Sequence, residues 1–279
     1  MLYGENVVTV YREADLDSFL GAWSIWKQFP NGTYVSRLET LLPSQIQGKD
    51  LYVVGNNAPL QTLIELTNHC RSVTVFAFEN SLALELQVLA RPIPRNFRVV
   101  FDELRSLVSL CWDYFFPDTQ RPILLEYVED KVLWRYTYPN TRAIFAALTT
   151  YPFNFETWDD LLHYGDPQQL THEGEYILRR VSRDIEQAIL QSRRRVNIAG
   201  FNVPLVNVTP NIASDTCIQL AKGEPFAACY WDTMEGRVFD IVTATNEVDV
   251  SQLAWHFGGH GNHREGRFQV PRTHPLAAV

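Results

Sequence analysis

The segment Asn6-Val-Val-Thr-Val-Tyr-Arg-Glu-Ala-Asp-Leu-Asp-Ser-Phe-Leu-Gly-Ala-Trp23 decides how the chain begins to fold. Its first six residues are rich in β-branched side chains and predict a short buried strand over 6–11. An acidic loop follows at 13–17, and apolar side chains then recur at the spacing of a helix. A strand, a loop and a helix in this order are typical of the start of a βαβ unit.

The same alternation continues along the first part of the chain. Pro59 opens a further helix, and three more β-rich runs predict strands at residues 50–54, 72–76 and 97–101. Strands that alternate with helices predict a parallel sheet with helices on both faces. Because the carboxyl ends of parallel strands meet at one edge, we expect the loops that begin near Glu13, Gly55 and Ala77 to lie side by side.

The middle of the chain is predicted to be helical, with helices at residues 104–116, 123–134 and 140–148. The stretch 150–170 is rich in Pro, Asp and Gly and predicts a connection. A long helix over 171–194 ends in Arg193-Arg-Arg195, which either complement the helix dipole or form a phosphate-binding patch.

From residue 196 the pattern changes to short strands, with a helix near 249–256 and a glycine-rich loop after it. This part predicts a smaller, mixed α/β unit. The expected division of the chain is a first domain, a connection with a linker helix, and a second domain, at residues 1–150, 151–195 and 196–279.

Composition limits the functions that the chain can serve. Of its 279 residues, 46% are hydrophobic, which is normal for a packed soluble protein. The net charge of -8 argues against a broad basic surface for long nucleic acids. The four cysteines lack the spacing of a zinc or redox motif and are expected to be buried free thiols. No signal peptide or membrane span is recognised, so a cytoplasmic protein is expected.

Several motifs follow one another in the order found in one known family. The loop Glu13-Ala-Asp15-Leu-Asp17 stands where that family has His-x-Asp-x-Asp, and Pro122–Trp134 matches a "Pro…Leu-Leu-x-Tyr-x-x-Asp…Leu-Trp" helix. Phe257-Gly-Gly-His260 is similar to the glycine-rich loop of the family's second domain. The chain thus resembles the DHH phosphoesterases. The resemblance implies an α/β protein with a parallel-sheet DHH-type domain, a smaller mixed DHHA1-type domain and a cleft between them.

The resemblance also implies a metal centre, because DHH phosphoesterases hydrolyse phosphodiesters or pyrophosphate with two divalent metals, usually manganese. Carboxylates that match or could replace the family's ligands are Asp15, Asp17, Asp130, Glu13 and Glu79. Other ligand positions have lost their side-chain donors and are now Gly55, Ala77 and Phe78. The set that remains predicts at most one Mn²⁺ or Mg²⁺ ion. An aspartate after a buried strand also often caps the next helix, and this alternative stays open for Asp15 and Asp17. For Asp130, on an aromatic helix, a structural role is the alternative.

In the second domain, the family contacts substrate phosphate through the backbone of its glycine-rich loop. The matching substrate-binding residues here are Gly258, Gly259, His260, His263 and Arg264. A structural role for the two histidines is the alternative. The arginine that the family carries on a preceding strand is absent, because that strand ends in Thr243.

Three functions remain open at this stage. The first is a DHH-like protein with a degraded metal site, weakly active or non-catalytic, that uses the cleft to bind a ligand or a protein partner. The second is a divergent one-metal phosphodiesterase for a small nucleotide or short oligonucleotide. The third is a binding module for a nucleotide or another small anion at residues 258–264. A small phosphorylated ligand or short nucleic acid is the expected partner and no membrane is expected, whereas the oligomeric state is not specified.

Overall fold

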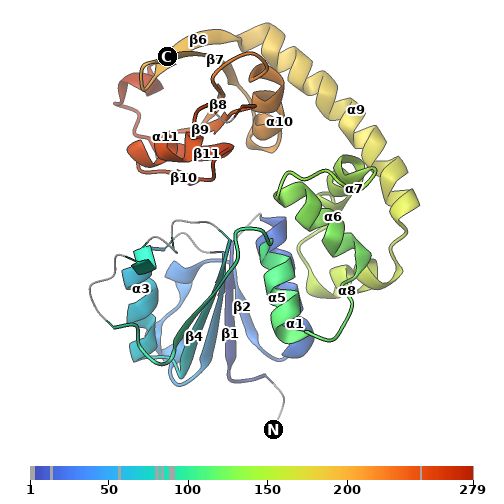
Figure 1. Ribbon diagram of the computed structural model, residues 1–279, viewed down its shortest axis with the longest axis vertical. Helices are drawn as coiled ribbons and strands as arrows, with labels where there is room; N and C mark the ends of the chain where they lie inside the picture. The colour runs from blue at the N-terminus through green and yellow to red at the C-terminus, as the bar shows by residue number, and fades with distance from the viewer. Residues whose placement is uncertain are drawn as a thin grey trace. The chain divides into compact units, whose positions relative to one another are not determined.

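In a computed structural model the chain forms two compact units, Met1–Ile177 and Leu178–Val279 (Figure 1). The structure describes residues 4–12, 15–55, 58–78, 82, 85–87, 92–245 and 247–278. Of the predicted site residues, Glu13 and Glu79 lie outside the described residues.

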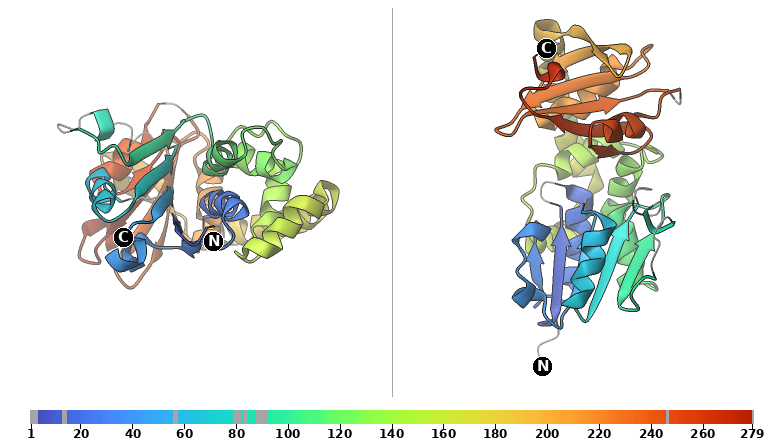
Figure 2. Two further views of the ribbon diagram at one scale, coloured as in Figure 1. Left: turned by 90° about the horizontal axis from the view of Figure 1, so that it is seen from below. Right: turned by 90° about the vertical axis from the view of Figure 1, so that its left-hand side faces the viewer.

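The first unit contains a five-stranded parallel sheet with the strand order β2-β1-β3-β4-β5. Its strands are β1 (Val7–Tyr11), β2 (Thr33–Val35), β3 (Asp50–Val54), β4 (Ser72–Ala77) and β5 (Phe97–Phe101). The right-hand view of Figure 2 has these strands side by side. Four of them were predicted within a residue or two, and β2 at the edge was not. The parallel sheet that the alternating pattern predicted is therefore confirmed.

Side chains alternate between the two faces of this sheet, as the pleat of a strand requires. Val8 and Val10 point to one face, which packs against α2 (Pro43–Ile46) and α3 (Leu60–Glu65). Val7 and Val54 point to the other face, toward α1 (Leu16–Gln28) and α5 (Leu107–Phe115). Figure 1 shows α3 on one side of the sheet and α1 with α5 on the other. Both faces are covered, which explains why the strands read as continuous apolar runs.

Helix α1 is buried all round, from Leu16 to Ile25, because it lies between two layers. One side faces the sheet, and the other faces an outer layer of helices that shares the cluster of Phe19, Trp23 and Trp158. The outer layer consists of α6 (Ile123–Val132), α7 (Thr141–Leu148) and α8 (Phe155–Tyr164). This burial fixes the positions of Asp15 and Asp17 at the start of the helix.

Two sequence predictions in this region were wrong. The supposed connection at 150–170 contains α8, which Asn154 caps by accepting the amide of Thr157 at 2.8 Å. The long helix α9 (Pro167–Ser192) begins four residues earlier than predicted and ends before the three arginines. Arg194 and Arg195 instead belong to strand β6 (Arg194–Ile198), where they bond to Tyr230 and Glu224, so neither caps the helix.

The second unit is built on a six-stranded mixed sheet with the order β10-β11-β9-β8-β7-β6. Neighbouring strands are antiparallel except for the parallel pair β7 and β8. After β6 the strands are β7 (Phe201–Asn207), β8 (Ala227–Asp232), β9 (Arg237–Val242), β10 (His260–Gly261) and β11 (Glu265–Val270). The mixed sheet was predicted, although β6 and β10 were not.

One helix covers each face of this second sheet. Helix α11 (Val250–His256) packs Val250 and Ala254 onto Phe239 and Phe268. Helix α10 (Pro210–Leu220), which the sequence did not predict, lies against the opposite face, where its Cys217 contacts the backbone of β9. Short 3-10 helices lie at Leu38–Thr40, Leu66–Asn68 and Pro275–Ala277. All four cysteines are free and buried, as predicted.

Candidate functional site

Arg12 follows β1 directly, and hydrogen bonds connect it through Ser18 of α1 to the neighbouring strand. The amide of Arg12 donates to the hydroxyl of Ser18 at 2.7 Å, and that hydroxyl donates to the carbonyl of Val54, at the end of β3, at 2.7 Å. Ser18 is fully buried, so this chain of bonds is shielded from water. Arg12 and the start of α1 are thereby fixed beside the end of β3.

Asp15 serves two partners within this loop. Its carboxylate accepts the amide of Ser18 at 3.2 Å and so caps α1. It also pairs with the guanidinium of Arg12, with 2.6 Å between Nη2 and Oδ2. The capping role that the sequence left open is therefore present in the structure. Arg12 was not recognised from the sequence as a site residue.

Asp17 is turned into the protein, with 3% of its surface exposed. Its two carboxylate oxygens accept hydrogen bonds of 2.9 Å each from the amides of Leu107 and Val108. These two residues are the first of α5. Burial raises the pKa of Asp17 to about 7, the charge of Asp15 adds to this, and the two amide hydrogen bonds oppose it. Asp17 thus joins α1 to the start of α5.

Gly55 follows β3 at the same edge and has a positive φ of 57°. A Cβ atom at this position would lie 2.3 Å from Cδ1 of Leu107 and 3.3 Å from Nε of Arg12. Glycine is therefore needed here for its backbone conformation and for the space above it. Phe78, which follows β4, is half-buried and packs against the cluster that contains Leu107.

Asp130 lies on α6 with 1% of its surface exposed and accepts four hydrogen bonds. The amide and the hydroxyl of Thr137 donate at 2.8 and 2.6 Å. The hydroxyl of Thr141 donates at 2.5 Å. The fourth comes from the amide of Tyr138 at 3.2 Å. Burial alone would raise the pKa of Asp130, but these hydrogen bonds lower it below its ordinary value. Asp130 therefore fixes the turn that leads from α6 into α7.

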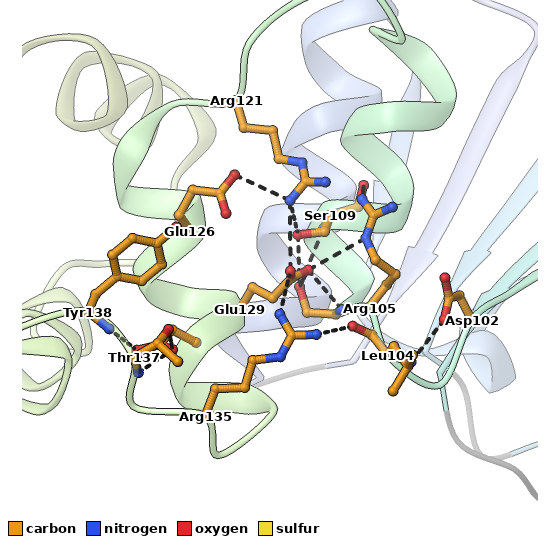
Figure 3. A network of polar contacts seen from close by, with 12 residues as sticks. Asp102, Leu104, Arg105, Ser109, Arg121, Glu126, Glu129, Arg135, Thr137 and Tyr138 are labelled. Atoms are coloured by element: carbon orange, nitrogen blue, oxygen red, sulfur yellow. Dashed lines mark hydrogen bonds and ion pairs between the residues drawn. The ribbon is translucent and has the colours of Figure 1, made fainter.

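Glu129, the neighbour of Asp130, forms the centre of a second polar network (Figure 3). Its buried carboxylate accepts the amide of Ser106 at 3.1 Å and a hydrogen bond from Arg135 at 3.1 Å. Arg105 and Arg121 approach it at 3.8 Å each, from the loops before and after α5. Three guanidinium groups thus stabilise one buried carboxylate, which holds α5 and α6 together. The motif at Pro122–Trp134 gave no signal for this role.

In the second unit, the glycine-rich loop forms a tight hairpin between α11 and β11. Gly259 has no room for a side chain, since a Cβ atom would lie 2.1 Å from the carbonyl oxygen of Arg267. Backbone amides that already donate inside the unit belong to Gly258, Gly259, Asn262, Arg264 and Glu265. These five amides would have to leave their partners before they could bind an anion, so they do not form a preformed anion nest.

Side chains of the same loop remain accessible. His263 and Arg264 are exposed and His260 is half-buried. The ring of His263 lies 3.9 Å from the carboxylate of Asp249, which also caps α11. Burial alone would raise the pKa of Asp249, but the hydrogen bonds from Ser251 and the charge of nearby His263 bring it below its ordinary value. Contact with a ligand through these side chains stays a prediction.

Sequence similarity to known proteins is low. No protein-family model matches the chain. The chain is 25% identical, over an alignment of 287 residues that covers 92% of it, to the uncharacterised protein R106 of Acanthamoeba polyphaga mimivirus. It spans only 65% of that protein's length.

Among solved structures, the chain is similar to a pGpG-specific phosphodiesterase, PggH, from Vibrio cholerae. The TM-score is 0.50 with 11% sequence identity, and the match covers 95% of this chain and 93% of that protein. The chain has a DHH-type fold. An exopolyphosphatase-related protein from Bacteroides fragilis also matches, with a TM-score of 0.46, 11% identity and coverage of 98% and 88%.

The DHH-type fold confirms the architecture that the ordered motifs predicted, with a parallel sheet followed by a mixed sheet. It does not by itself fix function. Among the residues that the structure describes, no helix is long and apolar enough to cross a membrane.

The described residues at this sheet edge do not by themselves form a site that fits a metal ion. Within the described ranges, no three His, Cys, Asp or Glu side chains come together in a group that could hold one. Asp15, Asp17 and Asp130 each accept hydrogen bonds or an ion pair from the protein itself. A cation would have to displace these partners to reach the carboxylates. Glu13 and Glu79 remain predictions, because they lie outside the described residues.

Proposed function

We propose that this chain is a binding protein built on a DHH-type scaffold and that it does not hydrolyse phosphodiesters with divalent metals. The observation that carries the proposal is the use of the three aspartates as structural acceptors. Asp130 alone accepts four hydrogen bonds. Asp17 accepts hydrogen bonds from the first two amides of α5. Two-metal hydrolysis needs carboxylates that are available to ions about 4 Å apart.

The proposed ligand is a small phosphorylated molecule of the nucleotide type. Arg12 lies at the carboxyl end of β1, and its planar guanidinium can donate hydrogen bonds to a phosphate oxygen. The Vibrio cholerae phosphodiesterase of similar fold is specific for pGpG, which makes this dinucleotide a sensible first probe.

Two measurements on the purified chain test this proposal. Calorimetric titration with pGpG in EDTA should give saturable binding, because no metal ion is needed. Incubation with pGpG and excess Mn²⁺ should leave the dinucleotide intact when the products are separated by chromatography. Manganese-dependent cleavage that is lost in Asp15→Asn would overturn the proposal.

A second candidate is the one-metal phosphodiesterase, and one observation favours it. The charges of Asp15 and Asp17 act on each other, so two carboxylates do lie near one edge of the sheet. Glu13, between β1 and Asp15, could add a third oxygen ligand. The same cleavage assay separates the two candidates, since Asp15→Asn abolishes activity only for the second.

A further inference from the structure

We propose that the guanidinium of Arg12 is the permanent cation of this sheet edge and takes the place of a divalent metal ion. The inference rests on the proposed function and deepens it, because it names the group that excludes the metal. It also states what a ligand phosphate would contact there, namely a fixed guanidinium.

The position of Arg12 is the first reason. It follows directly after β1, on the loop where the DHH resemblance implies metal ligands. Its Nη2 atom lies 2.6 Å from the Asp15 carboxylate, at the distance of a charge-assisted hydrogen bond. This ion pair gives the Asp15 carboxylate the positive partner that a metal ion would otherwise supply.

The space above Gly55 is the second reason. The Nε and Nη2 atoms of Arg12 would lie 3.3 and 3.4 Å from a Cβ atom built on Gly55. A carboxylate side chain at position 55 would have to extend into the volume that this guanidinium and Leu107 occupy. The missing carboxylate and the arginine therefore form one arrangement, in which glycine makes room for the cation.

The anchoring of Arg12 is the third reason. Its backbone amide donates to Ser18, and Ser18 donates to Val54, the residue before Gly55. The backbone of Arg12 is thus tied to the strand whose end its side chain covers. The Arg12 side chain is 22% exposed, so its charge is held near the surface but is not freely solvated.

This arrangement has an electrostatic consequence. Like charges that lie a few ångströms apart repel each other more strongly near a protein surface than in bulk water. A divalent ion placed beside Asp15 would face that repulsion and would also have to break the Arg12–Asp15 ion pair. The ion pair thus disfavours a divalent cation beside Asp15.

Titration with Mn²⁺ tests the assignment without any activity measurement. Calorimetry is carried out on the wild-type chain and on Arg12→Ala, Arg12→Gln and Arg12→Lys. Arg12→Gln is the milder variant, because it keeps a polar side chain if the alanine variant fails to fold. Arg12→Ala and Arg12→Gln should bind Mn²⁺ at least tenfold more tightly than the wild type and Arg12→Lys, and the gain should vanish when Asp15→Asn is added.

Arg71→Ala is the matched control. Arg71 pairs with Asp50 at the amino end of β3, the opposite edge of the same sheet, and its loss also leaves one aspartate without its guanidinium. This variant should bind Mn²⁺ no better than the wild type. The assignment would be overturned by an equal gain in Arg71→Ala, or by no gain in Arg12→Gln. Cleavage of pGpG by the wild type would instead overturn the proposed function, and this titration does not depend on it.

Discussion

The carboxylate of Asp17 accepts the backbone amide of Leu107 at 2.9 Å, across 90 residues of sequence. This bond joins the first turn of α1 to the first turn of α5. The amide of Val108 donates a second hydrogen bond to the same carboxylate. A residue that the family resemblance assigns to a metal thus also holds two helices of the core together. The structural role can be measured independently of any catalysis.

Asp17 should make the stability of the protein depend on pH. Burial raises its pKa from 3.8 to about 7, so between these values the folded chain binds more protons than the unfolded chain. Its contribution to the free energy of unfolding is therefore complete below about pH 4 and is lost as the pH rises through 7, by about 1.4 kcal/mol per pH unit. Urea unfolding should show that the free energy of unfolding of the wild type, relative to that of Asp17→Asn, falls between about pH 4 and pH 7. A difference that stays constant would contradict this.

Asp130 should have the opposite pH dependence. Its hydrogen bonds lower its pKa below 3.8, so its contribution is complete above about pH 4 and is lost at more acid pH. Asp130→Ala leaves the amides of Thr137 and Tyr138 without their acceptor and should lower the free energy of unfolding by about 2–4 kcal/mol. Thr137→Val, which keeps the carboxylate, serves as the control with a smaller loss. If Asp130→Ala in EDTA were as stable as the wild type, the structural role would be wrong.

Gly55→Ala should destabilise the first unit by about 1–3 kcal/mol, because Leu107 must move to admit the new methyl group. Gly48 offers a matched control at a φ of 69°, with no atom within 4 Å of its Cβ position. Gly48→Ala carries only the backbone strain, about 1 kcal/mol. Thermal unfolding of both variants should therefore rank Gly55→Ala as the less stable. Equal losses would mean that Leu107 adjusts freely.

A similar pair tests the loop of the second unit. Gly259→Ala would bring a methyl group to 2.1 Å from the carbonyl oxygen of Arg267, whereas Gly258 has a φ of 77° and open space around its Cβ position. Hydrogen exchange at the amides of β10 and β11 should accelerate far more in Gly259→Ala than in Gly258→Ala. Similar exchange in both variants would show that the hairpin does not need the close approach.

The strands of the first sheet could be predicted because each is a short run of β-branched residues between loops. Helix α8 was missed because the Pro, Asp and Gly content of residues 150–170 suggested a connection, although Asn154 followed by Glu156 is a usual helix start. The arginines of β6 were misassigned because the end of a helix and the start of a strand are adjacent there. Local patterns define elements better than their boundaries.

The candidate site was harder to predict, for a physical reason. The aspartates at 15, 17 and 130 could be recognised by spacing, but their partners come from distant segments such as Leu107 and Thr137. Arg12 stands beside the motif and still gave no signal, because its role depends on the space above Gly55. Sequence spacing finds the carboxylates and does not say what neutralises them.

Electron paramagnetic resonance of Mn²⁺ added to the wild-type chain tests the central claim most directly, since it counts free and bound ions. The account predicts no stoichiometric binding that depends on Asp15, and therefore the same free Mn²⁺ signal with the wild type and with Asp15→Asn. One equivalent of Mn²⁺ bound by the wild type and released in Asp15→Asn would contradict it.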